Sequence, residues 1–239
     1  MKVMILCGGR GTRLYEETEY RPKPLVKVGD KAIIVHIMEI FASHGHKAFT
    51  LCLGHKGDMI KTFFLNFATL TTDFTVDLVN TGVNSATGER IKRAFAHMEN
   101  KTFLATYGDG LANVDLGALI AHHKKMGRLA TVTGVRETSR FGVIESDRDG
   151  VVSRFREKPV LDGLISGGFF VFEPGVVDYL DEGPLESAPL ERLAADDQLA
   201  VYRHDGYFRC MDTYRDYLEL NALCEEGKIP WKGAPGANH

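Results

Sequence analysis

Residues 2–14 read KVMILCGGRGTRL, an apolar run that passes directly into three glycines interrupted by Arg10. The run predicts a buried strand, and glycine at this density favours close approach of another group to the backbone. No Lys-Ser or Lys-Thr follows as in a Walker A loop, and Leu14 stands where a Rossmann fingerprint has its last glycine. The loop still offers backbone N–H groups, the Thr12 hydroxyl and the guanidinium groups of Arg10 and Arg13, which suit a polyanion. A tight strand-to-helix turn is the alternative interpretation.

Outward from this strand, apolar and amphipathic segments alternate. Strand-like runs at 47–54, 75–82, 101–110 and 129–135 are separated by helical patterns at 32–45, 58–67, 87–98 and 116–127. Such alternation predicts an α/β fold of Rossmann-like type, with a mostly parallel central sheet and helices on both faces. After residue 136 three strand-like segments, at 141–146, 150–159 and 164–174, follow without long helices and predict a smaller β-rich portion. We expect a single domain over 1–239, with parts at 1–135 and 136–230 and a tail at 231–239.

The composition excludes several classes of protein. The chain has 239 residues, a net charge of −3 and 44% hydrophobic residues, which gives no electrostatic reason to expect nucleic acid or membrane binding. No secretory signal is predicted, because the first strand runs straight into the glycines. The cysteines form no CxxC motif, which favours reduced thiols. We therefore expect a cytoplasmic protein.

In open parallel sheets, ligands bind beyond the carboxyl ends of the strands. This rule predicts that the loops GGRGTR, VNTGVNSATG and YGDG face one crevice. Lys23, held between two prolines in RPKPL, would suit a phosphate clamp beside the glycine loop. An exposed loop lysine is the alternative.

Several dispersed motifs are similar to those of one enzyme family. LCGGRGTRL followed by RPKPLVKVGDKAIIVHIM resembles the opening signature of the sugar-1-phosphate nucleotidyltransferases. YGDG at 107–110, REKP at 156–159, SGGFFVF at 166–172 and MDT at 211–213 occur in the family's order, and CEEGKIPWK at 224–232 resembles the glucose-1-phosphate cytidylyltransferases in particular. The resemblance implies an enzyme that joins a sugar 1-phosphate to a nucleoside triphosphate and releases pyrophosphate. Residues 1–135 would then be mainly the nucleotide-binding half, and 136–230 mainly the sugar-binding half.

The resemblance also implies the catalytic residues and a cofactor. Arg13, Lys23 and Asp109 would be catalytic, and Asp109 and Asp212 would hold Mg²⁺. This assignment is chemically reasonable, because Mg²⁺ prefers carboxylate, phosphate and water oxygens. Without the family, each aspartate would be read as a helix N-cap.

Two groups of binding residues follow from the resemblance. The nucleotide would be bound by Leu6, Gly8, Gly9, Gly11, Thr12, Arg13, Lys23, Thr81, Gly82, Thr87, Gly88 and Arg90. The sugar phosphate would be bound by Gly142, Glu157, Lys158, Ser166, Gly167 and Gly168. For the first group the alternative is an ordinary glycine-rich loop with Thr87 as a helix cap. For the segment around Glu157 and Lys158 it is a solvated strand edge.

We expect CTP and glucose 1-phosphate as substrates and a homo-oligomer as the assembly. Two departures from the family pattern leave other substrates open. Ser166 stands where family members commonly have Asn, and the segment between Asn66 and Thr81 is shorter than is typical. The same chemistry with UTP, dTTP or GTP and another sugar or polyol phosphate is one alternative. A non-catalytic relative that senses nucleotide sugars or acts as a scaffold is another.

Overall fold

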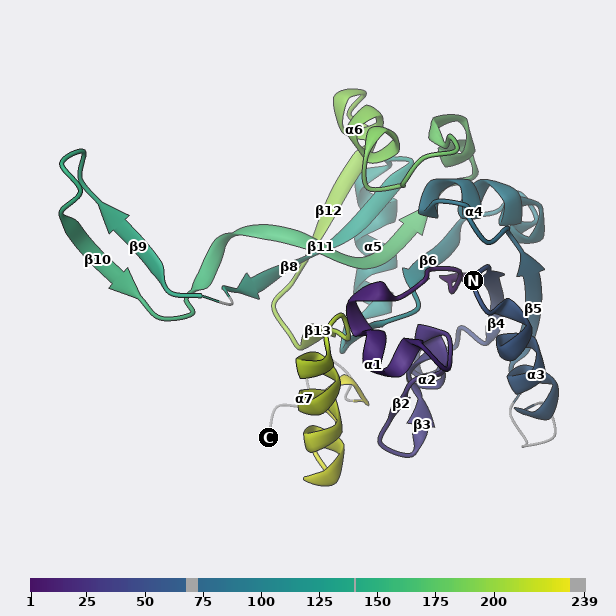
Figure 1. Cartoon of the computed structure of the whole chain (residues 1–239). Helices are drawn as coiled ribbons and strands as arrows, with labels where there is room; N and C mark the ends of the chain where they lie inside the picture. Colours follow the sequence, from purple (N-terminus) through teal and green to yellow (C-terminus); the bar gives the residue numbers. More distant parts are fainter. Residues whose placement is uncertain (68–72, 140, 233–239) are drawn as a thin grey trace.

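The computed structural model describes residues 1–67, 73–139 and 141–232. Its centre is a seven-stranded sheet in the order β12-β8-β11-β6-β1-β4-β5 (Figure 1). In chain order these strands are β1 (Lys2–Leu6), β4 (Ala48–Leu53), β5 (Thr75–Asn80), β6 (Phe103–Tyr107), β8 (Ala130–Thr138), β11 (Val160–Phe172) and β12 (Leu199–His204). The predicted strands are therefore confirmed.

The sheet is mostly parallel, as expected. β1 runs parallel to β4 and β6, β4 to β5, and β12 to β8, whereas β11 runs antiparallel to both β6 and β8. The reversal follows from the chain path, because a hairpin rather than a crossover helix joins β8 to β11.

Helices cover both faces of the sheet, each over its own apolar core. Along β1, Val3 and Ile5 belong to one core, whereas Met4 and Leu6 belong to the other, as strand alternation requires. The first core includes residues of α2 (Ile33–Ser43), α3 (Gly57–Phe67), α5 (Leu116–Met126) and α7 (Tyr214–Glu225). The second includes residues of α4 (Thr87–Ala94), η3 (Phe95–Met98), η4 (Pro174–Tyr179) and α6 (Ala188–Ala195).

Short elements complete the fold around the ends of the strands. A glycine loop leads from β1 into η1 (Thr12–Leu14) and α1 (Tyr15–Thr18), followed by η2 (Lys23–Leu25) and the small hairpin of β2 (Lys27–Val28) and β3 (Lys31–Ala32). β7 (Gly110–Ala112) pairs antiparallel with β13 (Phe208–Cys210), which brings the segment after Asp109 beside the segment before Asp212. The pairing places two distant acidic motifs together.

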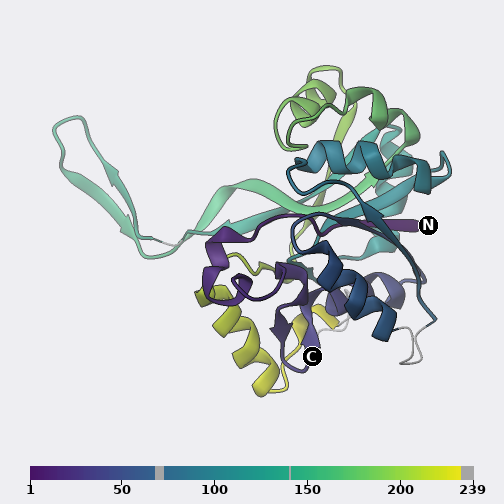
Figure 2. The ribbon, with the colours of Figure 1, turned by 45° about the vertical axis from the view of Figure 1, so that its right-hand side comes forward.

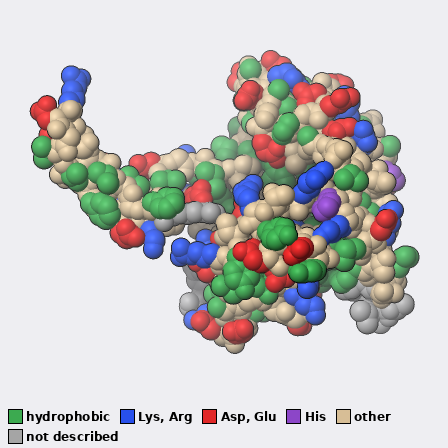
Figure 3. Space-filling model, in the orientation of Figure 1, with side chains coloured by type: hydrophobic (Ala, Val, Ile, Leu, Met, Phe, Trp, Pro, Cys, Tyr) green, Lys and Arg blue, Asp and Glu red, His purple; other side chains and the backbone are tan. Residues whose placement is uncertain are grey.

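A two-stranded arm projects from the body of the molecule. It consists of β9 (Val143–Ser146) and β10 (Val152–Arg156), which pair antiparallel and extend from the ends of β8 and β11 (Figures 1 and 2). Hydrophobic side chains line the arm in the space-filling view (Figure 3). The exposed ones include Phe141, Ile144, Val151, Val152 and Phe155.

The C-terminal segment packs onto the first core. Trp231, in η5 (Pro230–Lys232), is 2% exposed, and its indole Nε1 donates a hydrogen bond to Nδ1 of His36 at 3.3 Å. The rest of the expected tail, 233–239, lies outside the described residues, as does part of the short segment between Asn66 and Thr81. Among the residues that the structure describes, no helix combines the length and the apolar character needed to cross a membrane.

Candidate active site

A cavity of about 430 Å³ opens beyond the carboxyl ends of β1 and β6, where the crevice was predicted. Both the glycine loop after β1 and the segment Tyr107–Asp109 after β6 line it. The predicted nucleotide-binding residues that line this cavity are Leu6, Gly8, Gly9, Gly11, Thr12, Arg13, Lys23, Thr87 and Arg90. Thr81, Gly82 and Gly88 do not line it.

Arg90 fixes the position of the glycine loop. It is 3% exposed, and its Nη1 donates to the carbonyl oxygens of Leu53 and Gly82 and to the hydroxyl of Thr81, at 2.7–3.1 Å. Its Nη2 donates to the carbonyl oxygen of Gly8 at 3.0 Å. These bonds connect the glycine loop with the loop after β5, a positioning role that the sequence did not predict. Burial lowers the pKa of this guanidinium.

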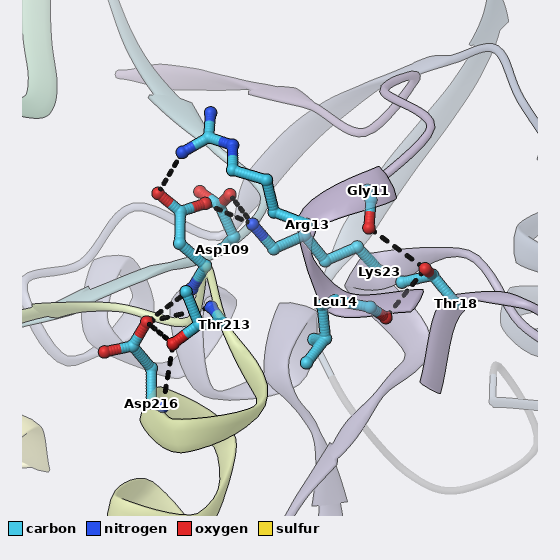
Figure 4. Close-up of polar contacts among 9 residues, drawn as sticks. Gly11, Arg13, Leu14, Thr18, Lys23, Asp109, Thr213 and Asp216 are labelled. Carbon is cyan, nitrogen blue, oxygen red and sulfur yellow. Dashed lines mark hydrogen bonds and ion pairs between the residues drawn. The ribbon is translucent and has the colours of Figure 1, made fainter. Parts of the chain in front are cut away.

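Four charged side chains that line the first cavity come from distant parts of the chain and contact one another (Figure 4). The ammonium Nζ of Lys23 lies 2.6 Å from Oδ2 of Asp109 and 2.7 Å from Oδ1 of Asp212. The guanidinium Nη1 of Arg13 lies 2.9 Å from Oδ2 of Asp212. The structure thus brings together all the residues predicted to be catalytic or to hold a metal ion.

Neither aspartate is a helix N-cap, which removes the alternative interpretation of both motifs. Asp109 is followed by β7, and the N-cap of α5 is Asp115. Asp212 precedes Thr213, the true N-cap of α7, which forms a reciprocal capping box with Asp216. Because the caps are supplied by other residues, the carboxylates of Asp109 and Asp212 remain directed at Lys23.

The electrostatics of this centre keep the side chain of Lys23 charged. Burial lowers the pKa of Lys23, but the neighbouring carboxylates of Asp109 and Asp212 outweigh burial and raise its pKa overall. Ligand atoms of Asp109, Asp212 and Cys210 lie within 4.8 Å of one another. Burial, followed by the charge of Asp109, raises the pKa of the Cys210 thiol, which keeps it neutral. Two carboxylates that already hold an ammonium ion are a donor set that fits a hard divalent cation.

A second cavity, of about 810 Å³, adjoins the first. The residues that line both are Arg13, Tyr107, Asp109, Glu186 and Asp212. Ser166 and Gly167, predicted for the sugar phosphate, line the second cavity only. The two cavities therefore meet at the acidic centre, an arrangement that suits two substrates reacting with each other.

The other predicted sugar-phosphate residues lie elsewhere. Gly142, Glu157 and Lys158 flank the strands of the arm and line neither cavity. The side chains of Glu157 and Lys158 are 63% and 50% exposed, and their charged atoms lie 3.6 Å apart. Gly168 lies beneath the ring of Tyr107.

Several cavity residues were not predicted from the sequence. Those with polar or charged side chains include Tyr107, Glu186, Arg136 and Arg209. Tyr107 belongs to the quoted YGDG motif, so its place in that motif was a usable signal. Glu186 belongs to no motif, and only the packing of its loop places it at the site.

Comparison with known proteins identifies the family of this chain. A family model described as nucleotidyl transferase matches residues 2–218. The chain is 42% identical to the glucose-1-phosphate cytidylyltransferase of Salmonella typhimurium over 97% of this chain and 99% of the relative. Among solved structures, HddC from Yersinia pseudotuberculosis superposes with a TM-score of 0.73 at 25% identity, covering 95% and 99% of the two chains. A UDP-glucose pyrophosphorylase complexed with UDP-glucose gives a TM-score of 0.72 at 17% identity, again covering 95% and 99%. The chain therefore belongs to the nucleotidyl transferase family.

Proposed function

We propose that the protein transfers the cytidylyl group of CTP to glucose 1-phosphate, giving CDP-glucose and pyrophosphate. The observation that carries this proposal is the meeting of two cavities at Asp109 and Asp212, whose carboxylates hold the ammonium of Lys23. The choice of CTP and glucose is supported by the 42% identity to a glucose-1-phosphate cytidylyltransferase over nearly the full length of both chains.

In this reaction a phosphate oxygen of glucose 1-phosphate attacks the α-phosphorus of CTP. The new bond forms between that oxygen and the phosphorus, while the bond from the phosphorus to the bridging oxygen breaks and pyrophosphate leaves. The attacking oxygen is already an anion, so no general base is needed. Catalysis then rests on positioning and on charge stabilisation.

Different residues of the first cavity position the substrates and stabilise their charges. Arg13 and the backbone N–H groups of the glycine loop hold the departing phosphates, because they line the cavity beside the acidic centre. Lys23 would neutralise charge on the α-phosphate, because its raised pKa keeps the ammonium protonated. Thr81, Gly82 and Gly88 do not line the cavity, and we propose that they support the segment that faces the cytosine base.

We propose Mg²⁺ as the cofactor, held by Asp109 and Asp212. When bound, it supplies charge neutralisation at the α-phosphate. The two carboxylates fit this ion because each presents an oxygen within 2.7 Å of the Lys23 ammonium, a position already adapted to positive charge.

For the hexose we propose contacts with Ser166 and Gly167 in the second cavity. Glu157 and Lys158 line neither cavity, and we keep them as proposed contacts of the sugar phosphate because of the family resemblance and the positive charge of Lys158. We assign residues 1–135 mainly to the nucleotide and 136–230 mainly to the sugar.

We further propose that the chain forms a homo-oligomer and acts in the cytoplasm. Exposed Phe141, Ile144 and Phe155 on the arm support self-association, because a two-stranded ribbon cannot bury its own apolar side chains. The four cysteines are free thiols, as is usual in a reducing compartment.

Pyrophosphate release tests the function. CTP, UTP, dTTP, GTP and ATP are each supplied with Mg²⁺, with and without glucose 1-phosphate. Release confined to CTP with glucose 1-phosphate supports the proposal. Pyrophosphate release with another nucleotide would support the same reaction with a different base. Nucleotide binding without pyrophosphate release, whichever sugar phosphate is supplied, would favour a non-catalytic relative.

A further inference from the structure

The carboxylate of Glu186 stands at the junction of the two cavities and lines both. Its Oε2 accepts a hydrogen bond from the hydroxyl of Thr87 at 2.7 Å, and its Oε1 accepts one from the hydroxyl of Tyr107. Both donors are neutral hydroxyls rather than cations. A carboxylate placed this way in a cavity for two polyanions requires an explanation, because it repels phosphate.

The loop that carries Glu186 is docked tightly onto the start of α4. The backbone N–H of Gly88 donates to the carbonyl oxygen of Gly183 at 3.1 Å, and the backbone N–H of Leu185 donates to the hydroxyl of Thr87 at 2.8 Å. A Cβ at position 88 would lie 2.7 Å from that Gly183 oxygen, closer than real Cβ atoms come. Glycine at 88 therefore allows the loop to sit where Glu186 meets Thr87.

The second partner, Tyr107, is held equally closely. Gly168 has a φ of +73°, and a Cβ there would lie 2.4 Å from the Tyr107 ring, so glycine leaves the space that the ring occupies. The ring also packs edge-to-face on Phe170, with centroids 5.9 Å apart. Burial, followed by the charge of Glu186, raises the pKa of Tyr107, so its hydroxyl remains a donor. Glu186 is thus oriented from two sides.

A carboxylate has about four acceptor positions, and Thr87 and Tyr107 use only two of these. Phosphate oxygens that are fully ionised cannot donate to the remaining positions, but sugar hydroxyls can. We propose that Glu186 accepts hydrogen bonds from hydroxyl groups of a bound sugar ring, either the ribose of the nucleotide or the hexose, and so determines substrate specificity. This inference rests on the proposed function, because only a nucleotidyl transfer places both rings near this junction.

Deoxy substrates and two variants test the proposal. Glu186→Gln and Glu186→Ala are compared with Glu182→Gln, which changes an exposed carboxylate of the same loop. For each protein, kcat/KM is measured with CTP against its 2′-deoxy and 3′-deoxy forms, and with glucose 1-phosphate against its deoxy forms. Circular dichroism and the thermal midpoint confirm that the variants fold, and Glu186→Gln preserves the shape of the side chain.

We expect one hydroxyl to matter. Removal of this hydroxyl should lower kcat/KM of the wild type about 10- to 100-fold, as for the loss of a hydrogen bond to a charged group. The same removal should hardly change kcat/KM of the Glu186→Ala variant. Ribose analogues and hexose analogues show which ring supplies the hydroxyl, and Glu182→Gln should behave as the wild type. Equal penalties in wild type and variants for every analogue, or no penalty in the wild type, would overturn the proposal. Failure of the proposed function would differ, because the wild type itself would then release no pyrophosphate.

Discussion

Replacing Lys23 by methionine removes the ammonium that lies between Asp109 and Asp212 while keeping an unbranched side chain that ends at Cε. The Lys23 side chain is 12% exposed, and the two carboxylates are 22% and 23% exposed. In the variant the two carboxylates face each other without their shared cation. We expect two consequences, one for stability and one for catalysis.

The magnitude follows from the distances. At 2.6 and 2.7 Å and an effective dielectric constant of about 20, each ion pair contributes roughly 6 kcal/mol of Coulomb energy before desolvation is subtracted. Removing one partner of a buried ion pair typically lowers the free energy of unfolding by about 3–5 kcal/mol. Because the carboxylates are partly exposed, we expect Lys23→Met to lower it by about 3 kcal/mol. Loss of the cation from the α-phosphate should also lower kcat about 10²- to 10³-fold.

Urea unfolding with and without Mg²⁺ separates the two effects. Without the ion, the free energy of unfolding of Lys23→Met should fall below that of the wild type. Added Mg²⁺ should stabilise the variant more than the wild type, because no ammonium competes for the carboxylates. The control is Lys27→Met, an exposed lysine that lines neither cavity. Wild-type stability and wild-type kcat in Lys23→Met would show that the ammonium contributes neither to folding nor to catalysis.

Three further changes have predictable outcomes. His36 accepts a hydrogen bond from Trp231, and burial lowers its pKa and keeps the imidazole neutral. In the unfolded chain the same imidazole takes up a proton below about pH 6.5, so the free energy of unfolding should fall as the pH drops below that value. This fall should be less steep in His36→Asn, which has no imidazole to protonate. Gly88→Ala should raise the KM for CTP and lower the thermal midpoint, because the new Cβ meets the Gly183 oxygen, and an unchanged KM would contradict this role. Phe155→Asp should shift the mass measured by light scattering toward the monomer, whereas an oligomer of unchanged mass would place the interface elsewhere.

Much of the fold could be predicted because local patterns and sheet geometry act together. The alternation of apolar runs with amphipathic helices predicts parallel strands, and parallel strands bring their carboxyl ends to one edge. The glycine loop after β1 and the YGDG segment after β6 therefore lie at the same edge of the sheet. The position and direction of β11 were not predicted. No local pattern indicates that the chain returns through the hairpin arm and runs antiparallel between β6 and β8.

The candidate site could be predicted where motifs carry its residues, and less well where burial decides their roles. Thr87 illustrates this limit. The sequence allowed a helix cap or a base contact, but the N-cap of α4 is Ala86, and the hydroxyl of Thr87 donates to Glu186, a contact that the sequence did not indicate. Arg90 is similar, because only the packing around it shows that its donors are directed to backbone oxygens. Contacts of this kind depend on the meeting of distant loops, which no local pattern records.

Product formation by wild type and Asp109→Asn tests whether this centre transfers a cytidylyl group. Both proteins are incubated with CTP, glucose 1-phosphate and Mg²⁺, and the nucleotide products are identified by mass spectrometry alongside the pyrophosphate released. We expect CDP-glucose and pyrophosphate in equal amounts from the wild type, with the rate lowered about 10²- to 10³-fold in Asp109→Asn. CMP in place of CDP-glucose, or an Asp109→Asn variant as fast as the wild type, would contradict this expectation.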